Sequence, residues 1–415
     1  MTDLFIFTSQ YPFAPGEEFF EEEAKLWGES IAFDVYLVPL KKTKNLRPYP
    51  KSLTLDLSFA QKNTKLRVIA YVISAILSKE FWIDISYLRE EKKLDSRNVV
   101  RLLKSTASLC LLYSLLKKLI RTTTPNAVIY TYWNNEISYA AAKLKKQKKI
   151  SKVITRLHRY DIYEEIYPGE YIPLKRQFLE HYDHIMLISE EAKNYVELRY
   201  GANSFQTSIE RLGVEIPLAA CSPSPKNYFH VISVSFCVPV KRIDKIVHAL
   251  AAFAQSRPHL QVKWIHIGNG PLLKKVQDLA KKQLNGKVDF EFLGYKKNSE
   301  IKRIYQKQPF DVFINCSHSE GVPVSIMEAM SFGVPTIAPN VGGIKELLGG
   351  TGYLMSSDPD VSELKNALIK IEKYCKYYEK RMRVRAHISS IYNAHINYTA
   401  LIKRISKTSS TDQGQ

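Results

Sequence analysis

Short apolar runs alternate with charged amphipathic stretches along the first half of the chain. The runs DLFIFTS, FDVYLVPL, AVIYTYW, KVITRLH and HIMLIS are rich in β-branched and aromatic residues and bounded by polar positions, as is typical of strands. Helical patterns lie between them, for example over residues 17–27 and 137–149. Strands that alternate with helices predict a parallel sheet covered on both faces.

The same alternation restarts after a proline-rich stretch. Residues 215–228, EIPLAACSPSPKNY, hold three prolines among small residues and predict an interdomain linker. The runs FHVISVSF, QVKWIHIG, VDFEFLG, DVFINCS and PTIAPN follow, with helical patterns between them. The pattern therefore predicts an α/β protein with two doubly wound, Rossmann-like domains, over 1–214 and 229–392. Such domains face each other across a cleft, and ligands bind there at the carboxyl ends of the strands.

Two segments stand outside this alternation. Leucines mixed with lysines over about 60–121 predict a basic amphipathic helical insertion in the first domain. It either lies on a membrane or packs on the sheet as a pair of helices. A C-terminal helix over 393–405 is expected to pack back on the first domain, and the polar tail over 406–415 is expected to be disordered.

Composition narrows the class of protein. The chain has 415 residues with 45% apolar content, which excludes a disordered chain and a small disulfide scaffold. Five cysteines without paired spacing predict a reducing compartment and no structural zinc site. The first residues lack the features of a signal peptide, and the uncharged apolar stretches are shorter than the roughly 20 residues that span a bilayer. A cytoplasmic, non-integral protein is expected.

Positive charge is concentrated in one stretch of the chain. The net charge is +19, and residues 41–152 hold 24 Lys and Arg against 7 Asp and Glu. This asymmetry indicates a nucleic acid, an anionic membrane surface or a polyanionic substrate as partner. A solvated basic face that serves solubility is the alternative.

The most informative segment is SHSEGVPVSIMEAMSFGVPTIAPNVGG, residues 317–343. A strand ends there, a loop with Glu320 and Gly321 follows, and a helix begins near Ser325 with Glu328 in its first turns. A helix N-terminus after a glycine-containing loop attracts anions through its unsatisfied N–H groups and its dipole. Two carboxylates beside it are suited to sugar or ribose hydroxyls, although both can equally be surface charges.

Two upstream segments favour a ligand-binding role for these carboxylates over a role as surface charges. Lys241 and Arg242 follow the first strand of the second domain, where they could meet a diphosphate held at the helix near Ser325. Residues 268–271, GNGP, predict a tight turn between a strand and a helix, which alone is an ordinary turn.

The order and spacing of these segments resemble the retaining glycosyltransferases of GT-B fold, in particular family 4. The resemblance implies that Glu320 binds hydroxyls of the transferred sugar, that Glu328 binds the ribose of the nucleotide, and that Lys241 lies at the donor phosphates. It implies a donor site completed by Arg242, Gly268, Asn269, Gly270, Gly294, Gly321, Val322, Val324 and Ser325.

The first half of the chain extends the resemblance. TRLHRYDIYEE, with Arg156, His158 and Asp161, looks like the segment in which the family places a catalytic histidine beside the reacting sugar. The loop with Gly16 and Glu17 occupies the position that approaches donor and acceptor. YTYW, residues 130–133, is similar to relatives that build bacterial surface polysaccharides.

The chain departs from the family pattern twice. Phe236 stands where many members carry an arginine that pairs with the lysine, so Arg242 becomes the candidate substitute. The sequence EGVPVS replaces the usual EGFGLP, and Pro323 has no N–H to offer a donor.

The resemblance implies a retaining enzyme that moves a sugar from a nucleotide-sugar donor to a glycan or lipid-diphosphate-linked acceptor in bacterial surface-polysaccharide biosynthesis. It implies no metal and no other cofactor. The basic stretch then indicates a peripheral position on an anionic membrane, at the inner face of the cell membrane, with no nucleic acid as partner. A GT-B-shaped nucleotide-sugar epimerase and a non-enzymatic polyanion-binding protein remain alternatives.

Overall fold

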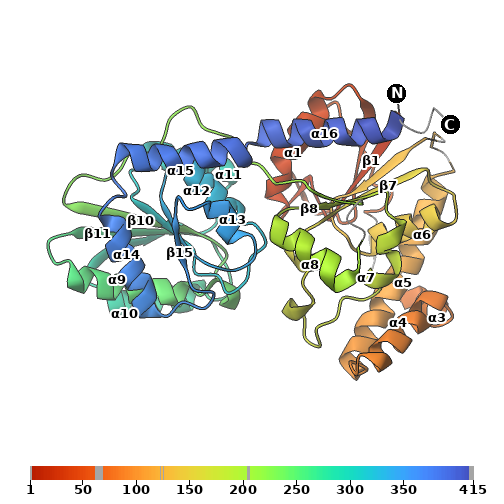
Figure 1. Cartoon of the computed structure of the whole chain (residues 1–415), viewed down its shortest axis with the longest axis horizontal. Coiled ribbons are helices and arrows are strands. Elements are labelled where there is room, and N and C mark those ends of the chain that lie inside the picture. The colour runs from red at the N-terminus through yellow and green to blue at the C-terminus, as the bar shows by residue number, and fades with distance from the viewer. Residues whose placement is uncertain (1, 61–68, 122, 125, 203–205, 411–415) are drawn as a thin grey trace. The chain divides into compact units, whose positions relative to one another are not determined.

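A computed structural model describes residues 2–60, 69–121, 123–124, 126–202 and 206–410 (Figure 1). These residues form two compact units. The first unit runs to Glu210 and also includes the described residues from Tyr398 onward, and the second unit is Arg211–Asn397.

The stretch predicted as a linker, 215–228, lies inside the second unit. Cys221 N donates to Phe332 O at 2.8 Å, and Ser224 N donates to Asp311 Oδ1 at 3.0 Å. Prolines and small residues in this stretch gave it the composition of a linker, but these hydrogen bonds tie it to the second unit.

The first unit is built on a parallel sheet. Within the described residues its strand order is β5-β3-β1-β6-β7-β8-β9, and every pairing is parallel. The strands are β1 (Thr2–Thr8), β3 (Phe33–Pro39), β5 (Thr54–Leu55), β6 (Val128–Thr131), β7 (Lys152–Leu157), β8 (His184–Leu187) and β9 (Thr207–Ile209). All four residues of β6 and all six of β7 are buried, as expected for strands covered on both faces.

Helices of the first unit follow the strands in the predicted alternation. They are α1 (Glu21–Glu29), α3 (Val72–Ile76), α4 (Lys79–Glu90), α5 (Ser96–Leu119), α6 (Glu136–Lys146), α7 (Lys175–Phe178), α8 (Glu190–Tyr200) and α16 (Ala394–Ser410). The antiparallel pair β2 (Phe13–Ala14) and β4 (Asn45–Leu46) lies outside the main sheet. Tyr398, Leu401 and Ile405 of α16 are buried, and the Arg156 guanidinium lies over the Tyr398 ring.

The predicted insertion is helical where it is described, and α5 packs into the unit. Leu102, Leu109 and Leu116 of α5 are fully buried in the core. Among the described helices, α5 is long and apolar enough to cross a membrane by length and composition, with a mean hydropathy of 1.5. Arg101 and Lys104 of α5 interrupt its uncharged apolar sequence. The length of uncharged stretches therefore did not identify this helix in the sequence. Packing of its leucines in the core accounts for part of its apolar character, since 39% of the apolar window is buried.

The second unit repeats the architecture with a parallel sheet in the order β12-β11-β10-β13-β14-β15. The strands are β10 (Tyr228–Val234), β11 (Gln261–Ile267), β12 (Val288–Phe292), β13 (Val312–Ile314), β14 (Thr336–Pro339) and β15 (Tyr353–Met355). The helices are α9 (Ile243–Ser256), α10 (Leu273–Leu284), α11 (Asn298–Lys307), α12 (Val324–Ser331), α13 (Ile344–Leu348), α14 (Val361–Glu372) and α15 (Tyr378–Ile391).

Strand order decides which loops of the second unit meet. The strands β10 and β13 are neighbours although β11 and β12 lie between them in sequence, so the strand order reverses at β10. Loops that follow parallel neighbours leave the sheet at the same edge, where ligands of such sheets bind. This topology brings the segment with Lys241 to the segment with Glu320.

The C-terminal tail differs in part from the prediction. The helix α16 continues to Ser410, so residues 406–410 are helical, whereas 411–415 lie outside the described residues. Because residues 406–410 are mostly polar, their sequence did not indicate that they continue the helix α16.

Candidate functional site

Lys241 and Glu320 form an ion pair at the carboxyl edge of the second sheet. Lys241 ends a short 3-10 turn, Pro239–Lys241, and Glu320 lies in the loop between β13 and α12. Lys241 Nζ is 2.5 Å from Glu320 Oε1, and Asn315 Nδ2 donates to the same oxygen at 3.2 Å. Both charged residues were predicted for this site, whereas Asn315, which directly follows the strand β13, had no sequence signal.

The ion pair keeps the buried Glu320 carboxylate ionised. Burial alone would raise the pKa of Glu320, but the Lys241 ammonium and hydrogen bonds outweigh burial and lower this pKa below its ordinary value. A charged carboxylate in a largely dry setting is a strong acceptor for the hydroxyl groups of a ligand.

Backbone contacts hold the Glu320 loop in place. His318 N donates to Val240 O, and Gly343 N donates to Gly321 O, both at 2.8 Å. Gly342 has φ +52°, and a Cβ built there would lie 2.1 Å from Glu320 O. Only glycine permits this close approach of the segment after β14.

The helix α12 begins directly after this loop. Pro323 is its N-cap, and Val324 and Ser325 are its first residues, so their N–H groups lie at the positive end of the helix dipole. Glu328, in the second turn, is nearly buried and accepts a hydrogen bond from Asn298 Nδ2 at the start of α11. The two carboxylates thus have different partners, Lys241 for Glu320 and Asn298 for Glu328.

Arg242 makes three side-chain contacts within the protein. Its Nε donates to Cys316 O at 2.7 Å, and its Nη2 donates to Ser317 O at 3.2 Å, while Nη1 contacts Asp358. The guanidinium therefore supports the end of β13. Phe236, which stands where the family's arginine is expected, is 58% exposed.

The turn at Gly268–Gly270 packs against the loop after β10. A Cβ at Gly268 would lie 1.8 Å from Ser235 O, and one at Gly270 would lie 2.6 Å from Cys237 O. Cys237 N donates to Asn269 O at 2.8 Å, and Gly268 N donates to Gly294 O at 2.9 Å. Backbone hydrogen bonds thus join Gly268 to Gly294 and Asn269 to the loop after β10, and Gly270 packs closely against Cys237 of that loop.

In the first unit, Glu17 organises the loop after β1. Its carboxylate accepts backbone N–H groups from Ser9 at 2.8 Å and from Gln10 and Tyr11 at 2.6 Å. It also accepts the Trp133 indole Nε1–H at 2.5 Å. Gly16, at φ +108°, precedes it in the loop. Glu17 is therefore placed to hold Trp133, which the sequence analysis quoted only within YTYW.

His158 lies against aromatic rings. Its ring centroid is 4.5 Å from that of Trp133 and 4.7 Å from that of Tyr132. Among the residues that the structure describes, neither ring nitrogen has a hydrogen-bond partner. Burial and, to a smaller extent, Arg156 lower the pKa of His158 well below its ordinary value, so the ring is neutral. Two unpartnered buried nitrogens are typical of a site that a ligand completes.

Arg156 and Asp161 serve the interior of the first unit. Arg156 Nη1 is 2.5 Å from Glu23 Oε2, and neither side chain is exposed. Asp161 accepts from Asn134 N at 2.8 Å and from His158 N. Burial raises the pKa of Asp161 to about 7 against the opposing effect of Lys175. Asp161 fixes the His158 backbone, while Arg156 binds Glu23 and the backbone oxygen of Glu210. Glu23 had no sequence signal beyond its place in a run of acids.

The comparisons with known proteins agree with this geometry. Residues 219–386 match the family model described as glycosyl transferases group 1. The O-antigen biosynthesis glycosyltransferase WbnH of Escherichia coli is 27% identical over 188 residues, which are 42% of this chain and 50% of that protein. The putative colanic acid biosynthesis glycosyltransferase WcaL of E. coli K12 is 26% identical over 218 residues, 50% of this chain and 52% of that protein. The match thus spans about half the length of these relatives.

Solved structures show the fold of both units. The lipopolysaccharide outer core galactosyltransferase WaaB in its apo form aligns with a TM-score of 0.67 at 16% identity, over 97% of this chain and 99% of that chain. Anabaena HepE in complex with UDP aligns with a TM-score of 0.62 at 18% identity, over 98% and 100%. The protein therefore has the GT-B fold. The match to the glycosyl transferases group 1 model covers most of the second unit and less than half of the chain, in agreement with the family resemblance.

Proposed function

We propose that this protein is a glycosyltransferase that moves a sugar from a nucleotide-sugar donor to a glycan or lipid-diphosphate-linked acceptor in bacterial surface-polysaccharide biosynthesis. The observation that supports the proposal is the Lys241–Glu320 pair directly before the N-terminus of α12. The family match over the same segment and the named activities of the relatives agree with it.

The groups at this site suit the charges that sugar transfer develops. The glycosidic C–O bond breaks with its electron pair on the donor diphosphate, so negative charge grows on the leaving phosphate. Lys241 and the first N–H groups of α12 would stabilise that charge. At an effective dielectric constant near 20, one cation about 4 Å from a unit charge contributes roughly 4 kcal/mol before desolvation.

Glu320 and His158 would act on the sugar. The ionised Glu320 accepts hydrogen bonds from sugar hydroxyls and stabilises positive charge on the ring, and the neutral His158 offers one donor and one acceptor. We propose retention of the anomeric configuration. The acceptor oxygen forms its bond on the face that the phosphate leaves, and the phosphate oxygen takes the acceptor proton. No separate general base and no metal ion is then required.

The acceptor and the location of the protein follow from charge and from one relative. UDP-Gal:alpha-D-GlcNAc-diphosphoundecaprenol alpha-1,3-galactosyltransferase of E. coli is 27% identical over 148 residues, 35% of each chain. An acceptor of that kind is carried by a lipid. The basic stretch over 41–152 would hold the enzyme peripherally at the anionic inner face of the cell membrane.

The test is transfer itself. The purified chain is incubated with nucleotide sugars of different bases and with short lipid-diphosphate glycans, and products are identified by mass and by NMR of the anomeric proton. We expect a product with the donor's anomeric configuration, in the presence of a chelator. Epimerised or free sugar without transfer would overturn the proposal, and an inverted anomer would overturn retention.

A further inference from the structure

Lys175 is a buried cation of the first unit. It lies in α7, and it is 0% exposed. An ammonium group is costly to bury unless its three hydrogens find acceptors, and lysine is almost never fully buried without partners. The partners of Lys175 therefore indicate what this side chain does in the interior.

The Lys175 ammonium has acceptors on two loops of the first unit. Nζ donates to Asn134 Oδ1 at 2.5 Å and to Asn134 O at 3.3 Å, and it donates to Asp161 O at 2.5 Å. Asn134 lies in the loop after β6, and Asp161 ends the 3-10 turn Arg159–Asp161 that follows β7. Because β6 and β7 are parallel neighbours, these loops leave the sheet at one edge, and Lys175 joins them there.

The loops that Lys175 joins carry His158 and Trp133. His158 directly precedes the turn, and Trp133 directly precedes Asn134. The Asp161 carboxylate strengthens the link, because it accepts from Asn134 N at 2.8 Å and from His158 N. The ring centroids of His158 and Trp133 are 4.5 Å apart. A shift of either loop would therefore move the His158 ring relative to the Trp133 ring.

The Asn134 amide connects Lys175 to the sheet. While Oδ1 accepts from Lys175, Nδ2 donates to Ser138 Oγ at 3.0 Å and to Thr155 Oγ1 at 3.2 Å. Asn134, Ser138 and Thr155 are all buried. Removal of the ammonium would take from Oδ1 the donor that it has in Lys175, and an unsatisfied buried oxygen favours rearrangement of the loop.

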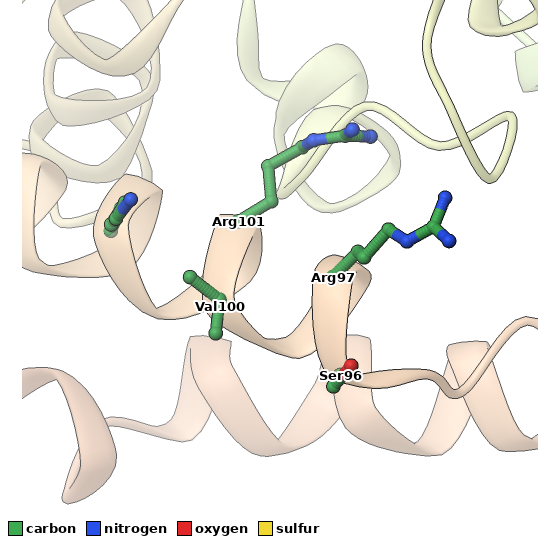
Figure 2. A pocket seen from close by; sticks show the side chains of 5 residues that line it. Ser96, Arg97, Val100 and Arg101 are labelled. Carbon is green, nitrogen blue, oxygen red and sulfur yellow. The ribbon is translucent and has the colours of Figure 1, made fainter.

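The backbone before Lys175 is held in an uncommon conformation. Leu174 has φ +66°, in the left-handed region that is unfavourable for leucine. Its N–H donates to Asp84 Oδ2 at 2.6 Å. Upstream, Arg101 Nη1 donates to Tyr171 O at 3.0 Å; Arg101 lines a pocket of about 490 Å³ at the start of α5, and Figure 2 shows its side chain extending from this helix. Such conformations persist where surrounding contacts fix them, and they are common at functional sites.

Acidic groups face the Lys175 ammonium from several elements. Burial lowers the pKa of Lys175 below its ordinary value, and Asp161, Glu164 and Glu136 oppose burial and raise this pKa. The Tyr139 ring of α6 lies with its centroid 5.9 Å from Nζ. A neutral amine has two hydrogens for three acceptors, so loss of the proton at alkaline pH would release one contact.

We propose that Lys175 is a positioning residue for sugar transfer. Its ammonium joins the loop after β6 to the turn after β7, and it thereby holds the His158 ring in the orientation in which this ring acts on the sugar. The inference rests on the proposed function and deepens it, because His158 has that role only in a glycosyltransferase.

The substitution Lys175→Met removes the charge at nearly constant side-chain length. We expect kcat for transfer to fall about 100-fold, comparable to the cost of a 1 Å misplacement at a reacting centre. The calorimetric affinity for the nucleoside diphosphate should stay within about twofold, because Lys241 of the second unit is unchanged. Values of kcat are corrected for the active fraction given by the binding stoichiometry. A kcat within threefold of the wild type would overturn the inference.

A second variant controls for loss of stability. Asp311 is buried and accepts from Ser224 N at 3.0 Å and from His230 N at 2.7 Å, at the start of β13. Asp311→Asn should lower the thermal midpoint and keep kcat within about threefold. Both variants are assayed well below their midpoints. Equal losses of kcat in Lys175→Met and Asp311→Asn would show a structural role only and would overturn the inference.

Fluorine NMR tests the link between the loops without substrate. The chain has four tryptophans, and Trp133→Phe assigns the Trp133 signal of a chain labelled with 5-fluorotryptophan. Between pH 7.5 and pH 10 the wild-type Trp133 signal should shift, whereas the signal of Trp264 in the second unit should not. Lys175→Met should have a displaced Trp133 signal that no longer titrates in this range. A constant wild-type Trp133 signal, or the same titration in Lys175→Met, would overturn the inference.

The two kinds of measurement separate this inference from the proposed function. Sugar transfer by the wild type with an unchanged kcat in Lys175→Met would contradict this inference alone. A wild type without transfer, whose Trp133 signal still responds to Lys175, would contradict the proposed function alone.

Discussion

Lys241 Nζ and Glu320 Oε1 lie 2.5 Å apart, although 79 positions separate the two residues in sequence. The parallel pairing of β10 and β13 brings the loops that carry them to one edge of the sheet. We propose that this pair, close to the start of α12, holds the leaving phosphate and the sugar of a donor.

Removal of the Lys241 ammonium should lower the rate of sugar transfer strongly and the stability of the fold only slightly. We expect Lys241→Met to lower the transfer rate by about 100-fold to 1,000-fold, comparable to loss of one donor that stabilises transition-state charge. Lys274→Met is the control, because the Lys274 side chain is 76% exposed and pairs with Asp278 on its own helix. Initial rates at saturating donor measure the effect. A rate for Lys241→Met within threefold of the control would contradict the prediction.

A substitution at Gly342, which lies against the Glu320 loop, should displace this loop and lower the transfer rate. A Cβ at Gly342 would lie 2.1 Å from Glu320 O, so Gly342→Ala should displace this loop and lower transfer at least tenfold. Gly350 has a similar left-handed backbone with φ +73° but open space around its Cβ position. Gly350→Ala therefore has comparable backbone strain and should keep its rate. Rates and thermal midpoints of both variants test this, and equal losses of rate would contradict it.

Glu17 should act as a positioning residue. Its carboxylate accepts three backbone N–H groups and the Trp133 indole, and an amide in its place offers only one acceptor oxygen. We expect Glu17→Gln to lower transfer about tenfold and to lower the free energy of unfolding by about 1–3 kcal/mol. Glu29→Gln, on the exposed end of α1, should change neither. An unchanged rate for Glu17→Gln, measured with urea unfolding of the same samples, would argue against this role.

Acid should destabilise the protein in part through His158. Its pKa is lowered in the folded state, so between that pKa and about 6.5 the unfolded state binds more protons. The contribution to the free energy of unfolding is therefore lost as pH falls below about 6.5, by about 1.4 kcal/mol per pH unit. Urea unfolding at pH 7 and pH 5 should show a smaller acid loss for His158→Gln than for the wild type. An equal loss would show that His158 is charged when folded.

The buried pair of Arg156 and Glu23 should govern stability. Arg156→Met leaves the Glu23 carboxylate uncompensated in the core and should lower the free energy of unfolding by about 3–5 kcal/mol. The double variant with Glu23→Gln removes both charges and should recover a large part of that loss. A double-mutant cycle in urea measures the coupling, and simple additivity would contradict it.

Local patterns predicted most of the second unit. The strands and helices from β10 to β14 produce clear alternation, because β10, β11, β13 and β14 are largely buried, whereas the edge strand β12 alternates with exposed positions. The short edge strands β9 and β15, with three residues each, had no comparable pattern. Composition of the predicted linker also does not reveal hydrogen bonds such as those of Cys221 and Ser224 to residues far along the chain.

Site residues were predictable where a motif carried them. Glu320 and Lys241 stood in recognisable segments, whereas Asn315 and Trp133 acquire their roles only from tertiary contacts. For Arg242 the sequence predicted a role, but the structure shows contacts that the sequence did not predict. Its position suggested a phosphate ligand, but its contacts with Cys316, Ser317 and Asp358 depend on the course of β13.

Calorimetric titration of the wild type and of Lys241→Met with a series of nucleoside diphosphates and their sugar conjugates tests the central claim most directly. The account predicts saturable binding of one nucleotide class to the wild type and at least a tenfold loss of affinity in Lys241→Met, with the Lys274→Met control unaffected. Equal affinities of wild type and Lys241→Met, or no binding by any nucleotide sugar, would contradict it.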